Sequence, residues 1–421
     1  MPSVKKLTDM GWTTADALWY YTPLSEPTLS SELERLSFAQ TIKDTDVVSF
    51  QPCPDPEQYS QDRYVIQDWA LPNGIWTFRA IFDGAHSGML DYHRNINLFQ
   101  PQGHAGHDTV DYTKDRLPDI VQKELLKMLG KGDGYTPADV SDALTRAISE
   151  FDKSIGEALL KLFPDADALA KLSDEEIHRV ISSQRVNQDI ILHCERGTTV
   201  LISLVSPVKS DIWVASLGDC AAVLGTTDSA GEWSATVLSS AHNGENEVEA
   251  NRIRSEHPGE PECMLDNRVL GAIAVTRAVG DFSFKLPAVY TERVLFNARP
   301  DSVMPDKVRK YIGRNLTPPY MTGVPDVKHL NLSALGSEKT VMVMCSDGLV
   351  DLSDDRLKLH EVLSKAWVKL VGEHYGDGQN LALRLLRDAL GGEDSEKVSR
   401  MITVEMGFRW MDDTTILVQR L

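Results

Sequence analysis

The chain has 421 residues, of which 42% are hydrophobic and 25% are charged, a composition typical of a folded globular protein. Its net charge of −19 argues against nucleic acid and anionic membranes as partners, because a strongly negative protein repels both. The five cysteines are scattered and form no CxxC pair, which argues against a zinc site or a disulfide framework and favours a reducing compartment.

No apolar run approaches the roughly 20 residues of a membrane-spanning helix. The N-terminal sequence also lacks the apolar core of a secretory signal. We therefore expect an intracellular protein, cytoplasmic or mitochondrial, that acts as a monomer and binds neither nucleic acid nor a membrane.

The first half of the chain predicts one strand and two long helices. Residues 1–60 are rich in Pro, Ser and Thr without a sustained period, so we expect an irregular lead-in. Alternating apolar residues that end in Asp-Gly predict a buried strand at 77–84. Apolar residues at helical spacing predict helices at 115–131 and at 136–163, the second opening on a Thr-Pro start.

The second half is dominated by β-branched runs bounded by Gly, Asp or Ser, which predict strands. Helical stretches come in pairs rather than in strict alternation with strands, which favours packed antiparallel sheets flanked by helices. No linker or internal repeat divides residues 61–421, so we expect one catalytic domain there. The expected strands are 198–206, 211–225, 233–240, 339–347 and 413–421, and the expected helices are 245–256, 354–372 and 378–390.

Aspartates lie at the ends of several strand-like runs. Each one alone is explained as a turn that ends a strand. If the strand ends converge, like charges repel by about 1–4 kcal/mol per pair at 4 Å, and a divalent cation would remove that repulsion. Mg²⁺ and Mn²⁺ prefer oxygen ligands, and no His/Cys cluster competes for a softer metal. The aspartates concerned are Asp62, Asp83, Asp219, Asp347, Asp351 and Asp412.

A set of segments, in this order, resembles the metal-dependent Ser/Thr protein phosphatases of type 2C. The resemblance runs from about residue 60 to the C-terminus, and the stretch that begins AHNGENEVEANRI also resembles the pyruvate dehydrogenase phosphatase branch. It implies an α+β fold, a four-layer αββα sandwich of two antiparallel sheets flanked by helices. The matching segments are FDG, GTTVLISLV, VASLGDCAAVL, LSSAHNGENEVEANRI, RVLGAIAVTRAVGDFSFK, MVMCSDGLVDLSDD and MDDTTILVQRL.

The resemblance also implies a site for two Mg²⁺ or Mn²⁺ ions. Asp83 would bridge the two ions, and the Gly84 carbonyl would ligate one of them. Asp347 and Asp412 would complete the protein ligands of the first ion. Asp62 would act on the second ion, largely through water.

A third, weaker ion is also implied, because Asp219, Asp347 and Asp351 match the acids that hold such an ion in some members. The implied reaction is hydrolysis of phosphoserine or phosphothreonine in a phosphoprotein substrate by a metal-activated water. Cys220 and Cys345 lie next to these acids and are interpreted as small buried hydrophobic residues rather than nucleophiles. Arg277 and Asp281, in TRAVGD, are expected to hold a loop.

The first motif departs from the family pattern. A histidine, a candidate general acid, should follow Asp83-Gly84 directly, but here His104 continues the motif only if 85–103 is an insertion. The competing alignment uses His86. Because the insertion lies beside the metals, an active phosphatase and a pseudophosphatase that serves as a binding module both stay open, as does a hydrolase of small phosphoesters.

Two further departures concern metal and phosphate binding. Gln61 stands where the family usually has Glu, so the second metal would lose one charge. Glu57 stands where many members have an arginine that binds the substrate phosphate.

Overall fold

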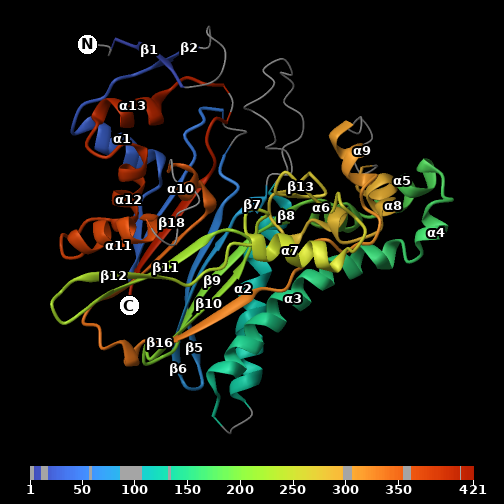
Figure 1. Ribbon diagram of the computed structural model, residues 1–421, viewed down its shortest axis with the longest axis horizontal. Coiled ribbons are helices and arrows are strands. Elements are labelled where there is room, and N and C mark those ends of the chain that lie inside the picture. The colour runs from blue at the N-terminus through green and yellow to red at the C-terminus, as the bar shows by residue number, and fades with distance from the viewer. Residues whose placement is uncertain are drawn as a thin grey trace.

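The computed structural model describes residues 4–10, 18–55, 59–85, 107–130, 134–296, 306–353, 362–407 and 409–421. Two antiparallel sheets form the centre of the molecule, and helices cover both outer faces (Figure 1). The expected αββα sandwich is confirmed. Within the described ranges, no helix combines the length and apolarity that a membrane span requires.

The two sheets are built from strands that lie far apart in the sequence. The five-stranded sheet has the order β16 (Asp326–Asn331), β10 (Asp211–Leu217), β9 (Val200–Val205), β6 (Gly74–Phe82) and β5 (Arg63–Leu71). The six-stranded sheet has the order β12 (Trp233–Val237), β11 (Ala221–Thr227), β17 (Thr340–Cys345), β18 (Thr414–Arg420), β4 (Thr45–Phe50) and β3 (Gln40–Ile42).

Strand β17 shows why the central strands read as unbroken apolar runs. Side chains alternate between the two faces of a strand. Met342 and Met344 therefore enter the core between the sheets, and Val341 and Val343 enter the core beneath the helices. Both faces are buried from Val341 to Cys345, so every position after Thr340 is apolar.

Three helices pack on the five-stranded sheet: α2 (Asp108–Leu129), α3 (Pro137–Leu162) and α6 (Arg185–Glu195). Helix α3 begins where its sequence predicts. The Thr136 hydroxyl accepts the Asp139 N–H, and the Asp139 carboxylate accepts the Thr136 N–H, which forms a capping box ahead of the first-turn proline. Shorter helices α4 (Ala166–Leu169) and α5 (Asp174–Ser182) lie between α3 and α6 in the chain.

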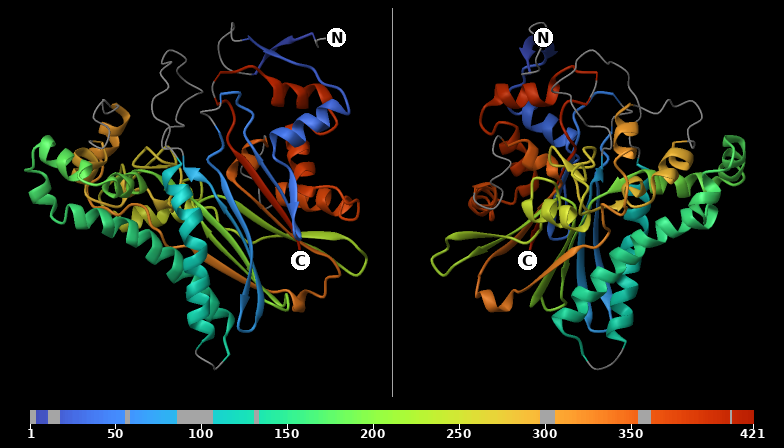
Figure 2. Two further views of the ribbon diagram at one scale, coloured as in Figure 1. Left: turned by 180° about the vertical axis from the view of Figure 1, so that it is seen from behind. Right: turned by 45° about the vertical axis from the view of Figure 1, so that its right-hand side comes forward.

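The opposite outer face carries α1 (Thr28–Leu36), α11 (Ser364–Glu373), α12 (Leu381–Leu390) and α13 (Ser395–Thr403). Figure 2 shows these helices and the α2–α3 pair on opposite sides of the sheets. Helix α10 (Asp347–Asp351) directly follows β17.

A smaller lobe with its own apolar core joins β12 to β16 along the chain. It contains α7 (Glu247–Glu256), β13 (Met264–Leu265), β14 (Arg268–Val269) and α9 (Asp306–Ile312), whereas α8 (Ala288–Tyr290), in the same stretch of chain, packs in the core of α3 and α6. Strands β7 (Gly84–Ala85), β8 (Gly197–Thr198) and β15 (Val279–Gly280) form a short sheet of their own. Short turns of helix occur at Phe282–Phe284, Thr291–Leu295 and Ser333–Leu335.

The structure corrects two expectations about elements. The lead-in 1–60 is not irregular: β4 pairs with β18 inside the six-stranded sheet, and β1 (Lys6–Asp9) pairs with β2 (Leu18–Tyr21). The predicted strand 211–225 is two strands, β10 and β11, in different sheets. Gly218, between them, has a φ of 110°, and the chain turns there from one sheet to the other. Of the predicted helix 354–372, residues 354–361 lie outside the described residues.

Candidate functional site

Strand ends from both sheets position the six aspartates. Asp62 lies directly before β5, Asp83 directly after β6, and Asp412 two residues before β18. Asp219 occupies the turn between β10 and β11, and α10 begins at Asp347 and ends at Asp351. Each carboxylate is therefore held by a buried strand or by the turn that follows one.

The charges of these aspartates act on one another, which shows that the strand ends converge. Burial, then Asp347, Asp62, Asp412 and Asp219, raise the pKa of Asp83 well above its usual value. Burial, then the other carboxylates, also raise the pKa of Asp347. Like charges in a site of low dielectric favour the protonated form.

Two further pKa values rise within the same cluster. Burial, followed by the charge of Asp413, raises the pKa of Asp62 to about 7. Burial also raises the pKa of Asp219 to about 6, and the charge of Asp351 adds to the rise. Asp62 is only 3% exposed, whereas the other five aspartates are partly exposed, so the cluster borders solvent on one side.

The donor set fits a hard divalent cation. No group of three His, Cys, Asp or Glu side chains in the described ranges already has the arrangement that could hold a metal ion. The carboxylates nevertheless raise one another's pKa, and Asp62 Oδ1 is buried without a hydrogen-bond partner among the described residues. A divalent cation would relieve the repulsion and supply that partner. The donors are oxygens, which Mg²⁺ and Mn²⁺ prefer.

Ser346 holds Asp62 in place. The Ser346 hydroxyl donates a hydrogen bond of 2.6 Å to Asp62 Oδ2 and accepts the Thr415 N–H at 2.9 Å. Sequence reasoning missed Ser346, because its partner Asp62 lies in a distant part of the chain. The one signal in the sequence was the position of this serine, between the apolar run of β17 and Asp347.

Asp413 supports the same corner of the site. It accepts hydrogen bonds from the Gln61 N–H at 2.8 Å and from Gln51 Nε2 at 2.9 Å, and Arg409 lies 3.1 Å away. Its carboxylate is therefore occupied by protein partners, although its charge adds to the field at Asp62. Asp412 was predicted as a site residue from its motif, whereas its neighbour Asp413 was not.

The backbone at Asp83 and Gly84 is tightly fixed. The Asp83 carbonyl accepts the Thr199 N–H at 2.9 Å and the Thr198 hydroxyl at 2.8 Å. A Cβ at Gly84 would lie 3.0 Å from Gln61 Cβ and 3.1 Å from Gln61 O, so a side chain would disturb this contact. The glycine therefore lets β7 approach Gln61 closely.

Ala85, the first residue of the expected insertion, belongs to β7 and pairs with Gly197 of β8. The remainder of 85–103, together with His86 and His104, lies outside the described residues, as does Glu57. Assignment of the general acid to His104 stays a prediction.

An arginine and a histidine border the site beside Asp62. Arg63 Nη1 donates to the Asp62 carbonyl at 2.9 Å, and Arg63 Nε donates to Asp111 Oδ1 at 2.7 Å. The His107 ring stacks on Tyr59 at 3.9 Å, and its Nδ1 lies 3.0 Å from Arg63 Nη2. Burial, together with the charge of Arg63, lowers the pKa of His107 to about 4. Sequence reasoning identified neither residue.

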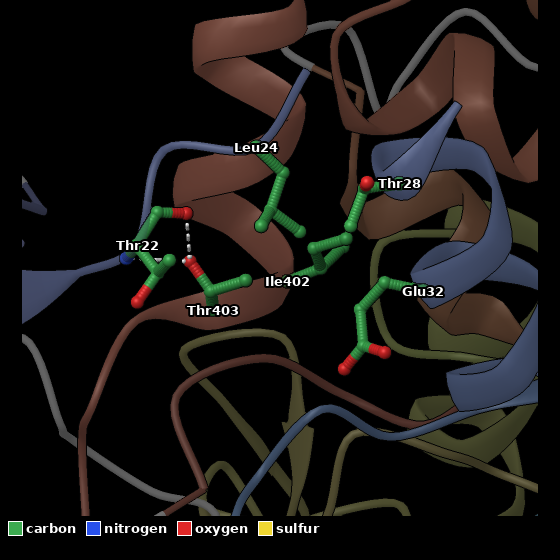
Figure 3. A pocket seen from close by; sticks show the side chains of 6 residues that line it. All are labelled: Thr22, Leu24, Thr28, Glu32, Ile402 and Thr403. Carbon is green, nitrogen blue, oxygen red and sulfur yellow. Dashed lines mark hydrogen bonds between the residues drawn. The ribbon is translucent and has the colours of Figure 1, made fainter. Parts of the chain in front are cut away.

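Figure 3 shows a hollow of about 320 Å³ at another place in the molecule. It lies between helix α13 on one side and helix α1 with the segment that precedes it on the other. A single acid, Glu32, lines it, and the Thr403 hydroxyl donates to the Thr22 carbonyl beside it. With one carboxylate and no cluster of like charges, this hollow does not have the chemistry of the aspartate site.

Comparison with known proteins gives results that agree with this geometry. The sequence matches the family model described as "Protein phosphatase 2C" over residues 98–390. A protein phosphatase 2C homolog of Schizosaccharomyces pombe is 28% identical over 404 residues, which cover 88% of this chain and 78% of that protein.

A second relative is the mitochondrial pyruvate dehydrogenase (acetyl-transferring) phosphatase 1 of Homo sapiens. It is 30% identical over 260 residues, which cover 53% of this chain and 47% of the relative, so this chain spans about half of that relative's length. Among solved structures, a C. elegans sex-determining protein gives a TM-score of 0.50 at 15% identity, covering 90% of this chain and 65% of that one. That likeness concerns the fold alone.

Proposed function

The chain belongs to the protein phosphatase 2C family, and we propose that it hydrolyses phosphoserine and phosphothreonine in phosphoproteins with two bound Mg²⁺ or Mn²⁺ ions. The observation that carries this proposal is the convergence of aspartates from both sheets at one partly exposed edge. Their mutual repulsion is the electrostatic condition under which divalent ions bind, and metal dependence is general in this family.

The residues that would hold the ions are those that the family resemblance implies, and the mutual effect of their carboxylates supports this assignment. Asp83 would help hold both ions, the Gly84 carbonyl would serve one of them, Asp347 and Asp412 would complete the first, and Asp62 would serve the second. The residues left for a third, weaker ion are Asp219 and Asp351, next to Asp347. When bound, such ions lower the pKa of a shared water and neutralise the charge on the phosphoryl oxygens.

The protein's own part in the reaction is to hold these groups still. Ser346 fixes one oxygen of Asp62 and leaves the other available. Asp413 accepts the Gln61 N–H and so fixes the backbone next to Asp62. We propose His104 as the group that protonates the leaving serine or threonine oxygen.

Phosphothreonine and phosphoserine peptides are the substrates to test first. Relatives named as pyruvate dehydrogenase phosphatases make that phosphorylated dehydrogenase the first whole protein to assay. The full chain should release phosphate from p-nitrophenyl phosphate and from a phosphothreonine peptide with Mn²⁺, and a chelator should abolish both activities.

The pattern of activities separates the proposal from its competitors. Turnover of the aryl phosphate without turnover of any phosphopeptide or phosphoprotein would indicate a small-molecule phosphoesterase. Mn²⁺ binding without turnover of either substrate would indicate a pseudophosphatase. Either result would overturn the proposal.

A further inference from the structure

His242 clamps the backbone of Gly218, the residue before Asp219. The Gly218 N–H donates to His242 Nδ1 at 3.2 Å, and the His242 N–H donates to the Gly218 carbonyl at 2.9 Å. The ring is 1% exposed. One residue therefore binds both backbone polar groups of Gly218. Since Nδ1 accepts a hydrogen bond, the ring proton lies on Nε2.

The next residue continues the same contact. The Asn243 side chain lies beside the Asp219 carboxylate and interacts with it. The consecutive residues His242 and Asn243 therefore contact Gly218 and Asp219 of the β10–β11 turn. Gly218 also packs closely against Thr199, because a Cβ at Gly218 would lie 2.4 Å from Thr199 Cβ.

Behind His242, charged side chains extend the contact into the smaller lobe. His242 Nε2 lies 3.1 Å from Asp326 Oδ2, a close contact without hydrogen-bond alignment, and Arg277 Nη1 lies 3.0 Å from Asp326 Oδ1. Arg277 also donates to both oxygens of Glu249 on α7, at 3.0 and 2.6 Å. This confirms that Arg277 holds a loop. The Thr276 N–H donates to the His242 carbonyl at 2.8 Å, which ties TRAVGD to the same residue.

We propose that His242 is a positioning residue that holds Asp219 for a divalent cation, and that Asp326 and Arg277 connect this grip to the smaller lobe. The inference rests on the proposed function only in taking Asp219 as a cation ligand. Residues that orient metal ligands through hydrogen bonds commonly contribute about 10–100-fold to metal affinity.

A matched pair of substitutions separates the two contacts of the ring. In H242N, the amide oxygen can replace Nδ1 as the acceptor for the Gly218 N–H, but the side chain is too short to reach Asp326. In H242Q, the amide nitrogen can replace Nε2 toward Asp326, and the Gly218 N–H loses its acceptor. D326N is a third variant, which removes the charge from a side chain that is 43% exposed.

The structure offers a control of the same kind. His329 Nε2 lies 2.8 Å from Asp211 Oδ1, in a second His–Asp contact between strands β10 and β16. The His329–Asp211 contact lies at the end of the β10–β16 pair that is farther from Gly218. H329A should therefore disturb the same two strands without changing the Asp219 turn.

The first measurement needs no metal and no substrate. Amide hydrogen exchange in chelator should be at least about 10-fold faster in H242Q than in wild type at peptides that contain Gly218 and Asp219. H242N should stay close to wild type, and so should H329A. Equal exchange in H242Q and wild type, with both folded, would overturn the proposal.

The second measurement is calorimetric titration with Mn²⁺ alone. H242Q and H242A should weaken the weakest site about 10–100-fold and leave tighter sites unchanged. In a D219N background, H242A should have no further effect. An unchanged weakest site, no such site in wild type, or an equal loss in the D219N background would each contradict the proposal. If these shifts appear in a protein that hydrolyses no phosphoester, the positioning role stands and the proposed function fails.

Discussion

Ser346 and Asp62 lie 284 positions apart in the sequence and share a hydrogen bond of 2.6 Å. Ser346 directly follows β17 of the six-stranded sheet, and Asp62 directly precedes β5 of the five-stranded sheet. The bond therefore joins the two sheets at the edge where the aspartates converge. Because Asp347 follows Ser346, the bond also fixes the position of the Asp62 carboxylate relative to Asp347. Asp62 is the residue expected to serve the second ion.

We expect S346A to weaken binding of the second Mn²⁺ and lower kcat/KM by about 10–100-fold, because Asp62 loses the donor that orients it. Mn²⁺ titration and phosphopeptide kinetics would measure this. S234A is the control, since the Ser234 hydroxyl bonds to Thr226 Oγ1 at 3.0 Å, at the β12 edge of the same sheet. Equal metal affinity in S346A and S234A would contradict the role given to Ser346.

In the metal-free protein, the stability contributed by Asp62 and Asp219 should be lost as the pH rises from about 4 to about 7. An aspartate whose pKa is raised by folding stabilises the folded state below its unfolded pKa, and this contribution is lost as the pH rises through the folded pKa. The folded values are about 6 for Asp219 and about 7 for Asp62. Urea unfolding in chelator, compared between wild type and D62N, would show this.

The difference in unfolding free energy, D62N minus wild type, should grow across that pH interval, because the asparagine carries no charge to bury. Saturating Mn²⁺ should reverse the trend for wild type. A difference that shrinks with rising pH would mean that Asp62 is stabilised as a carboxylate without metal.

The cysteines beside the site should be dispensable for catalysis. Burial raises the pKa of Cys220 and of Cys345, so neither is the thiolate that a nucleophile requires. C220S and C345A should keep kcat within about 3-fold of wild type and form no trappable phosphocysteine. Loss of activity in a folded C345A protein, judged by its unfolding temperature, would require a different mechanism.

Deletion of 85–103, which joins Gly84 to His104, should raise kcat and leave the unfolding temperature nearly unchanged. Loop closure costs little extra free energy for a long loop, whereas a displacement of about 1 Å in a catalytic group costs about 10²-fold in rate. Within the deleted protein, H104A should lower kcat. In the full-length protein, H86A should have little effect. An unfolded or less active deletion variant would show that the segment is part of the site.

Several elements could be predicted because their signals are local. Helix α3 carries its own capping box, and β17 is an unbroken apolar run. Strand β4 could not be predicted, because its partner β18 comes from the other end of the chain. The same holds for the site. The aspartates follow from motifs, but Ser346, Asp413 and His242 act through hydrogen bonds between distant segments, and no local pattern records these.

The most direct test of the metal mechanism measures binding and hydrolysis together in wild type and in D83N, D347N and D412N. We expect at least two Mn²⁺ per wild-type chain, loss of both ions in D83N, and loss of one in D347N and D412N. Hydrolysis of the phosphothreonine peptide should fall by more than about 100-fold in each variant. Unfolding temperatures in chelator should stay equal or rise, because each substitution removes a repelled charge. Hydrolysis by wild type in chelator, or wild-type Mn²⁺ binding by D83N, would contradict the two-metal site at these aspartates.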